Sequence, residues 1–330
     1  MRGATIVRWT GRGRLEDLEG AIARILVIEG KKATISTAGR SLLLEGPEPV
    51  GVAALLAYLP GVDWLAVGRS SDSVRGLAAE LARLARIYVR PGGRFAIRVE
   101  SEDPRMKPSD LAGAGNSAVL DAVKGSRVSE DAPSTIFRVA FDGKRGVASV
   151  EIGRGPGGTA MGRKVARCLV SGGKHSSVLA WDAMLSGYSV QLVHAEAGDD
   201  SLMAAARLYA ELSHRVDPNR LSLLVLRGGG ARQMISRWAR GIPGAAFAGF
   251  HAECHSEPKS IARNVYFPLY FLPEEEFDRI FSGMRVKSVD SRETWAGGGG
   301  KATRVLTYGG VRADVSAVLD GLRGRRPRPS

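Results

Sequence analysis

Residues 168–179 read Cys168-Leu169-Val170-Ser171-Gly172-Gly173-Lys174-His175-Ser176-Ser177-Val178-Leu179. An apolar run stops at Ser-Gly-Gly and a helix-like pattern begins at His175, which predicts a strand, a glycine-rich turn and a helix N-terminus in succession. Glycine lets a ligand approach the main chain, and Ser176 and Ser177 can cap a helix whose free N–H groups favour an anion. The stretch favours phosphate binding over the alternative, a tight turn without a ligand. It is neither the GxxxxGKS/T nor the GxGxxG motif.

Composition bounds the class of protein. A chain of 330 residues fits two or three domains, and 44% hydrophobic with 25% charged residues is typical of a globular protein. The formal charge of +13 suggests a polyanionic partner, most commonly nucleic acid, with a merely solubilising surface as the alternative. No run of about twenty apolar residues is present, and residues 1–9 lack a signal-peptide pattern. We therefore expect a cytoplasmic protein without a membrane partner.

The two cysteines, Cys168 and Cys254, include no CxxC pair, so no metal site is expected from them. Cys168 lies within the apolar strand and is expected to be a buried core residue.

The first 70 residues predict a small domain of their own. Apolar patterning indicates strands at 4–9, 33–37, 41–45 and 62–67, with helices near 15–26 and 50–58. This β-α-β-β-α-β order is that of a ferredoxin-like domain, in which both helices cover one face of an antiparallel sheet.

A second α+β unit is predicted over residues 71–163. It comprises a helix around Leu77 to Ala85, a strand at 95–100, a helix from Ser109 to about Lys124, and strands at 135–141 and 147–152 joined by a hairpin. Basic residues on its loops and strand ends could contact phosphates, with a solvated face as the alternative. They are Arg94, Arg98, Arg105, Lys107, Lys124, Arg127, Lys144 and Arg145.

From residue 164 to 283 strands alternate with helices, which predicts a parallel, doubly wound sheet. Ligands in such folds bind beyond the carboxyl ends of the strands. Residues 171–177, 195–199 and 249–255 all fall at that edge. Residues 284–330 predict a glycine-rich joint followed by a basic C-terminal tail.

The 171–177 loop resembles the SGGxDS signature of the PP-loop ATP pyrophosphatases. Ser171, Gly172, Gly173 and Ser176 match, and His175 stands where that family has Asp. Residues 71–163 resemble a THUMP domain, an RNA-binding module, and residues 153–162 resemble the glycine-rich linker that joins THUMP to the PP-loop domain. Residues 1 to about 282 are therefore similar to the tRNA 4-thiouridine synthase family, also called thiamine-biosynthesis sulfurtransferase.

The resemblance implies an enzyme that uses ATP and Mg²⁺ to adenylate a tRNA uridine at its C4 oxygen, after which a persulfide sulfur displaces AMP. It implies a tRNA partner, and it leaves open a sulfur-donor protein and a homodimer. Cys254, between two histidines, is the candidate sulfur-carrying thiol, and His175 is a second candidate catalytic residue. The residues implied in nucleotide binding are Ser171, Gly172, Gly173, Lys174, His175, Ser176, Ser177, His194, Ala195 and Gly249.

Two departures keep alternatives open. His175 removes a carboxylate that helps to organise phosphates and metal, and Phe250 follows Gly249 where relatives tend to have Glu. The leading hypothesis is an ATP-dependent tRNA sulfurtransferase. The second is a degenerate relative that binds tRNA, with or without nucleotide, but does not adenylate. The third is an unrelated nucleotide-binding protein whose basic surface is incidental.

Overall fold

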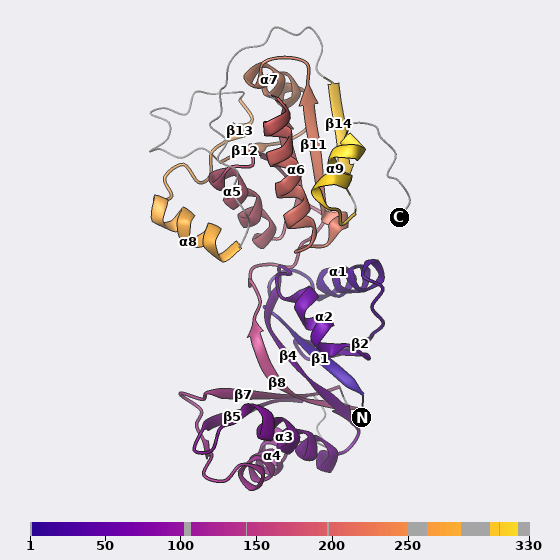
Figure 1. Cartoon of the computed structure of the whole chain (residues 1–330), viewed down its shortest axis with the longest axis vertical. Coiled ribbons are helices and arrows are strands. Elements are labelled where there is room, and N and C mark those ends of the chain that lie inside the picture. Colours follow the sequence, from indigo (N-terminus) through magenta and orange to yellow (C-terminus); the bar gives the residue numbers. More distant parts are fainter. Residues whose placement is uncertain are drawn as a thin grey trace. The chain divides into compact units, whose positions relative to one another are not determined.

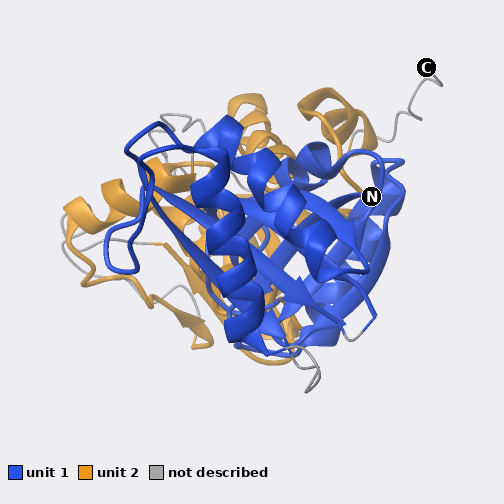
Figure 2. Ribbon diagram, turned by 90° about the horizontal axis from the view of Figure 1, so that it is seen from below, with its two compact units in different colours: residues 1–160 blue, residues 161–330 orange. Residues whose placement is uncertain are grey.

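A computed structural model describes residues 2–101, 107–142, 144–196, 198–249, 263–284, 304–309 and 311–322. The chain forms two compact units, residues 1–160 (unit 1) and 161–330 (unit 2) (Figure 2). Within the described ranges, no helix is both long enough and apolar enough to cross a membrane.

Unit 1 begins with the predicted β-α-β-β-α-β order and adds a second α+β half (Figure 1). Its elements are β1 (Gly3–Trp9), α1 (Leu15–Ile28), β2 (Thr34–Ala38), β3 (Ser41–Glu45), α2 (Pro49–Leu56), β4 (Val62–Ser71), α3 (Val74–Tyr88), β5 (Arg94–Ser101), α4 (Pro108–Ala122), β6 (Arg127–Val128), β7 (Thr135–Phe141) and β8 (Gly146–Arg154). Helix α1 buries Leu18, Ile22 and Ile25 because residues three and four apart share one side of a helix. Ser73 caps the N-terminus of helix α3, where its hydroxyl accepts a hydrogen bond from the amide of Gly76.

The eight strands described in unit 1 form one sheet, in the order β2-β3-β1-β4-β8-β7-β5-β6. Strand β4 lies in its middle, antiparallel to β1 on one side and to β8 on the other. The domain boundary expected near residue 70 falls within this strand, so the sheet is continuous across it.

The sheet of unit 1 curls over one of its faces. Arg8 of β1 forms an ion pair with Glu100 of β5, although β4, β8 and β7 lie between them in the sheet. In a flat sheet, strands four positions apart would be separated by about 19 Å, since neighbours lie about 4.8 Å apart. A second bridge joins Ser36 of β2 to Asp142, with 3.1 Å between Oγ and Oδ2. The two ends of the sheet therefore approach each other across its concave face.

Both faces of this sheet carry apolar cores. Helices α1 and α2 pack on the convex face beside residues such as Val7 and Leu65, and α3 and α4 pack on it beside Phe95 and Phe137. The concave face buries a third cluster contributed by strands of both halves. Its members are Ala4, Ile6, Ala38, Leu43, Trp64, Ala66, Ala140 and Val147.

Unit 2 has the expected alternation of strands and helices. Its elements are β9 (Val165–Leu169), α5 (Lys174–Leu185), β10 (Ser189–Ala195), α6 (Asp199–Ser213), a 3-10 turn (Pro218–Arg220), β11 (Leu221–Arg227), α7 (Ala231–Gly241), β12 (Ala246–Ala248), β13 (Val265–Tyr266), α8 (Glu274–Met284), β14 (Arg304–Gly309) and α9 (Val315–Leu322). The sheet order is β13-β12-β9-β10-β11-β14. The strands from β13 to β11 pair in parallel, and β14 adds an antiparallel edge that the patterning did not predict.

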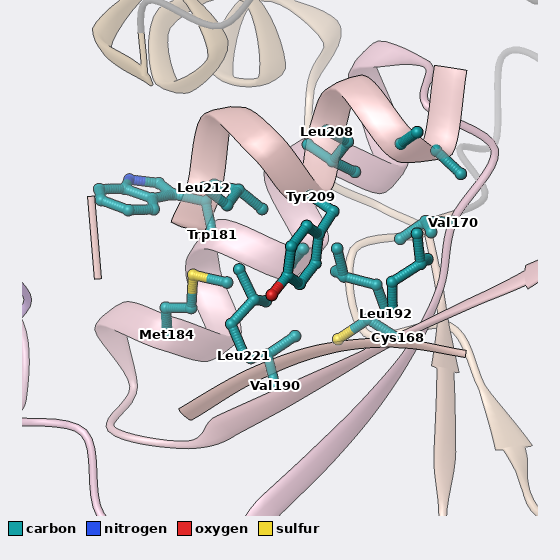
Figure 3. Close-up of a cluster of buried hydrophobic side chains, with 14 of the residues drawn as sticks. Cys168, Val170, Trp181, Met184, Val190, Leu192, Leu208, Tyr209, Leu212 and Leu221 are labelled. Carbon is teal, nitrogen blue, oxygen red and sulfur yellow. The ribbon is translucent and has the colours of Figure 1, made fainter. Parts of the chain in front are cut away.

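The core of unit 2 lies between this sheet and helices α5, α6 and α9. Figure 3 shows the ring of Tyr209 among aliphatic side chains, with the sulfur of Cys168 beside them. Cys168 is fully buried, as predicted. Its burial, with a smaller contribution from Asp182, raises the pKa of the thiol to about 12.

Candidate functional site

The turn between β9 and α5 lies at the point where the sheet of unit 2 reverses its winding. Strand β9 has β10 on one side and β12 on the other, both parallel to it. Strands β10 and β11 follow β9 on one side of it in the sheet, whereas β12 and β13 lie on its other side. In doubly wound sheets the crevice at such a switch point is where ligands bind. The turn predicted from residues 171–177 therefore lies at the edge where doubly wound sheets bind ligands.

Hydrogen bonds of serine hydroxyls stabilise this turn. Ser176 Oγ lies 3.2 Å from both the amide nitrogen and the hydroxyl of Ser171. Ser171 Oγ in turn accepts the amide of Gly173 at 3.3 Å. Gly172 has φ +89°, a left-handed conformation that glycine adopts without strain. The turn is thus a preformed structure whose amide groups point inward around two serine side chains.

The expected helix cap is wrong. Helix α5 begins at Lys174, earlier than predicted, and Gly173 occupies the cap position without a side-chain hydrogen bond. Ser176 and Ser177 lie inside the first turn, and their hydroxyls donate back to the carbonyl of Gly173 at 3.1 and 2.9 Å. The first amides of α5 are therefore not capped by these serines.

Two glycines near the turn allow close packing of neighbouring elements. A Cβ at Gly172 would lie 2.5 Å from the Cβ of Ala204 in α6. A Cβ at Gly249, just after β12, would lie 2.7 Å from the carbonyl oxygen of His175. Contacts below 3.0 Å force the surroundings to move, so both positions require glycine in this arrangement. Their predicted part in nucleotide binding stays a prediction.

Lys174 and His175 at the start of α5 contact acidic residues of α8. Lys174 Nζ lies 2.7 Å from Asp278 Oδ1 and also pairs with Glu274. The second oxygen of Glu274 lies 3.0 Å from His175 Nε2. Burial alone would raise the pKa of Glu274, but the hydrogen bonds from Lys174 and His175 outweigh it and lower that pKa. Burial lowers the pKa of Lys174, and the carboxylates of Asp278 and Glu274 more than reverse this, so it is raised. Lys174 and Glu274 are therefore both charged at neutral pH.

The sequence reasoning did not foresee α8 in this site. Glu274 lies 100 positions from Lys174 in sequence, and no local pattern joins the two. The available signal was the run Glu274 to Glu276 directly after Pro273. An acidic first turn complements the cations of the loop, but sequence does not show that they meet.

His194 and Ala195 end β10 beside the same turn. The imidazole of His194 is 2% exposed, with Nδ1 2.9 Å from the carbonyl oxygen of Val170 and Nε2 3.3 Å from Ser201 Oγ. Burial lowers the pKa of His194, despite an opposing contribution from the hydrogen bond with the carbonyl of Val170. The neutral ring therefore ties β10 to the end of β9 and to α6. Adenine binding by the main chain of His194 and Ala195 stays a prediction.

Three of the predicted RNA-binding residues of unit 1 lie on β5 and on its neighbour β6. Arg94 and Arg98 alternate with Phe95 and Ile97, which pack against the helices, so both arginines lie on the opposite face. Arg94 pairs in parallel register with Arg127 of β6, which places Arg127 on that face too. We call Arg94, Arg98 and Arg127 the basic stripe. All three side chains are exposed, and in the described part of the chain no carboxylate pairs with them.

The other predicted cations divide between the two ends of β5. Lys124 follows α4 and lies near the Arg94 end, whereas Lys107 precedes α4 and lies near the Ser101 end. Lys144 and Arg145 belong to the hairpin between β7 and β8. The last residue of β7, Phe141, pairs with Ser101, so this hairpin lies at the Ser101 end of β5. Arg145 Nη1 lies 3.1 Å from Glu45 Oε2, so part of its charge is already balanced.

Several predicted residues lie outside the described ranges. They are Arg105 of the RNA-binding set, the candidate thiol Cys254 with its neighbouring histidines, and Phe250.

Solved structures reveal what fold this is. No protein-family model matches the sequence, and no curated protein is significantly similar to it. The structure of PH1313 from Pyrococcus horikoshii OT3 aligns with 86% of this chain and 99% of its own, with TM-score 0.67 and 16% identity. A 4-thiouridine synthetase in complex with RNA and bound ATP aligns with 86% of this chain and 85% of its own, with TM-score 0.68 and 15% identity. The chain has the fold of these two proteins.

This likeness confirms the fold class expected from the sequence, a multidomain α/β protein that ends in a doubly wound sheet. It covers both the curled sheet of unit 1 and the sheet of unit 2, since 86% of the chain is more than either unit alone. At 15–16% identity the likeness concerns the fold, and the chemistry has to be argued from the residues.

Proposed function

We propose that the protein binds tRNA through unit 1 and ATP at the β9–α5 turn, as an ATP-dependent tRNA sulfurtransferase of the 4-thiouridine-synthesis type. The observation that carries the proposal is the position of the Ser171–Gly173 turn at the switch point of its sheet. It is supported by the fold, which is that of a 4-thiouridine synthetase solved with RNA and ATP.

The turn provides groups that suit a phosphate chain. Helix α5 begins just beyond the end of β9 and receives no side-chain cap from Gly173, and the dipole of a helix favours an anion at such an N-terminus. Lys174 adds an ammonium there, and the amide of Gly173 makes only a long hydrogen bond to Ser171 that a phosphate oxygen can replace. Bound ATP would supply the adenylate that activates the uridine oxygen. The residues of this chain hold the phosphates in line and stabilise the charge that leaves with pyrophosphate.

The sulfur step requires a thiol that can ionise. Cys168 is excluded from this role because it is fully buried and its pKa is raised to about 12. Cys254 is the other cysteine of the sequence, and we assign the sulfur to it or to a sulfur-donor protein.

The basic stripe and the cations around it form the proposed tRNA surface. These arginines are exposed and have no acidic partner among the residues that the structure describes, so their charge is available for phosphates, and neutralising phosphates releases counterions. A likeness of fold alone would not require these charges, so their grouping along β5 is an independent argument for RNA.

Gly173→Val tests the nucleotide site. Gly173 has φ −77° and ψ 171°, an extended conformation open to valine, so unit 2 should fold normally. The branched side chain would keep phosphates from the first amides of α5, and losing two such charge-assisted bonds, each about 1.5–3 kcal/mol, should weaken ATP binding by about a hundredfold or more.

Isothermal titration calorimetry measures this change. Gly153→Val, at a position with open space around it in unit 1, is the control and should bind ATP like the wild type. Equal ATP affinity of Gly173→Val and the wild type would rule out phosphate binding at this turn.

The catalytically degenerate relative is the second candidate, favoured by the surroundings of His175. Its imidazole contacts Glu274 and cannot replace a carboxylate as an oxygen ligand of Mg²⁺. Among the described residues, no three His, Cys, Asp or Glu side chains are grouped to hold a metal ion. These residues do not fit Mg²⁺, and we derive no step through it.

His175→Asp separates the two candidates. The substitution places a second carboxylate opposite Glu274, and two carboxylates repel unless a cation lies between them. A degenerate wild type would bind ATP equally with and without Mg²⁺ and would release pyrophosphate slowly. In the variant, Mg²⁺ should tighten ATP binding by about tenfold, or 1.4 kcal/mol.

Pyrophosphate release in the presence of tRNA, followed by nucleoside analysis, is the measurement. His175→Asn, which has the shape of Asp without its charge, is the matched control and should behave like the wild type. Rapid Mg²⁺-dependent turnover by the wild type, with no gain from Asp, would eliminate the degenerate candidate.

A further inference from the structure

Helix α8 brings two carboxylates onto the cation that begins α5. Lys174 Nζ contacts Asp278 Oδ1 at 2.7 Å and pairs with Glu274, which also reaches His175 Nε2 at 3.0 Å. A lysine ammonium has three donors. Two of these donors are directed at carboxylates of α8, although a phosphate is the partner that the proposed nucleotide site would give them.

A buried aromatic ring fixes this contact. Phe277 is fully buried, and its ring meets that of His175 edge-on, with centroids 4.6 Å apart and an interplanar angle of 83°. Phe277 and Asp278 lie three and four residues after Glu274 in α8, so both neighbour Glu274 on one face of the helix. The carboxylates are thus carried to Lys174 by a packed helix face and are not chance surface neighbours.

Phosphate and the carboxylates of α8 compete for the ammonium of Lys174. Glu274 and Asp278 lie 31% and 63% exposed, with Glu274 held in its charged form by the shift described above. An incoming phosphate would meet two negative charges at the start of α5 as well as an ammonium already engaged. Like charges brought close together repel, and the repulsion is weaker where solvent screens them.

We propose that α8 is an autoinhibitory element of the nucleotide site, with Glu274 and Asp278 as competitors of phosphate for Lys174. Binding of a polyphosphate transfers Lys174 from the two carboxylates to phosphate oxygens and releases α8 from the first turn of α5. The inference rests on the proposed nucleotide function of this turn and adds to it a device that sets affinity.

The experiment uses the full chain with inorganic pyrophosphate and with ATP, both in EDTA, followed by titration calorimetry. Glu274→Gln/Asp278→Asn removes both competing charges and keeps the shapes of the side chains. Glu275→Gln/Glu276→Gln is the matched control, because it makes the same change of charge on the same helix. In α8, Glu276 pairs with Arg279, with 2.6 Å between Oε2 and Nη2, and not with the turn. We expect about tenfold tighter binding of both probes by the first variant and less than about twofold change in the control.

A second readout follows the helix itself. Pyrophosphate should accelerate hydrogen exchange of α8 peptides in the wild type, since release of α8 removes its contacts with α5, and it should leave exchange in α6 unchanged or slower. The single substitutions Glu274→Gln and Asp278→Asn should each give part of the gain in affinity, which keeps the test valid if the double variant does not fold.

The outcomes separate the inference from the function beneath it. Wild-type binding of ATP with no gain in the α8 variant, or α8 exchange slowed by pyrophosphate, overturns the autoinhibitory role and leaves the nucleotide site standing. Binding by neither protein removes the nucleotide function and the inference with it. Binding by the variant where the wild type shows none supports both.

Discussion

Replacing the basic stripe, Arg94, Arg98 and Arg127, with glutamine is expected to weaken tRNA binding by about a hundredfold at low salt. Each phosphate contact contributes about 0.7 to 0.9 to the slope of log affinity against log salt, so losing three contacts should reduce that slope by about 2 to 3. The side chains are exposed and lack acidic partners in the described part of the chain, so their removal leaves the fold intact. Filter binding or fluorescence anisotropy across a salt series measures both quantities.

A matched triple variant makes this test specific. Arg14, Arg75 and Arg86 are equally exposed arginines of unit 1 that lie outside the stripe, on or next to α1 and α3. Their replacement by glutamine lowers the net charge by the same amount and should change affinity only slightly. Equal losses in the two triple variants would mean that tRNA responds to overall charge, and the basic stripe would then have no special part in binding.

Glu151→Gln is expected to destabilise unit 1 by about 3 to 5 kcal/mol, the usual cost of leaving one partner of a buried ion pair alone. Arg138 donates to Glu151 Oε2 from Nε at 2.9 Å and from Nη2 at 2.6 Å. The two side chains are only 8% and 10% exposed. The guanidinium also lies 4.1 Å from the centre of the Trp64 ring, on the concave face of the sheet. Without the carboxylate, a positive charge would stay buried against apolar neighbours.

Urea titration with hydrogen exchange of β7 and β8 peptides measures the effect within unit 1, since the two units need not unfold together. Glu16→Gln is the control, because the Arg14–Glu16 pair is 76% and 70% exposed and should contribute nothing measurable. The double replacement Arg138→Met/Glu151→Leu should recover most of the loss, as apolar pairs of similar volume often do. A loss in Glu16→Gln as large as in Glu151→Gln would show that the burial of the pair has no special importance.

Local patterning predicted most elements of this fold because each carries its own signal. Leu18, Ile22 and Ile25 mark α1 by their spacing, and the apolar run into Ser171 marks the end of β9. The curl of the unit 1 sheet could not be predicted, because it depends on pairs such as Arg8 with Glu100, which are 92 positions apart. The antiparallel β14 was missed as a partner of β11 for the same reason.

The candidate site likewise has parts that local sequence predicts and parts that depend on residues distant in sequence. The turn at Ser171–Gly173 is local and was found from sequence, whereas the acids that meet Lys174 come from α8. The expected role of Ser176 and Ser177 as caps was wrong because α5 begins at Lys174 with Gly173 at the cap position, and helix ends are the least certain feature of any pattern. The basic residues were recognised individually, and only the β5–β6 register shows that three of them share a face.

Strand β4 has a consequence for how this chain could be divided or inherited. Cutting near residue 70 would leave one fragment with the ten residues of β4 as an open edge, and the other with the nine of β8. Long unpaired edges promote association with other chains. The same cut would separate Ile6 and Leu43 from Ala140 and Val147, which share one apolar cluster. A division of the chain that keeps both halves of the curled sheet together therefore falls at the boundary between units 1 and 2, after residue 160.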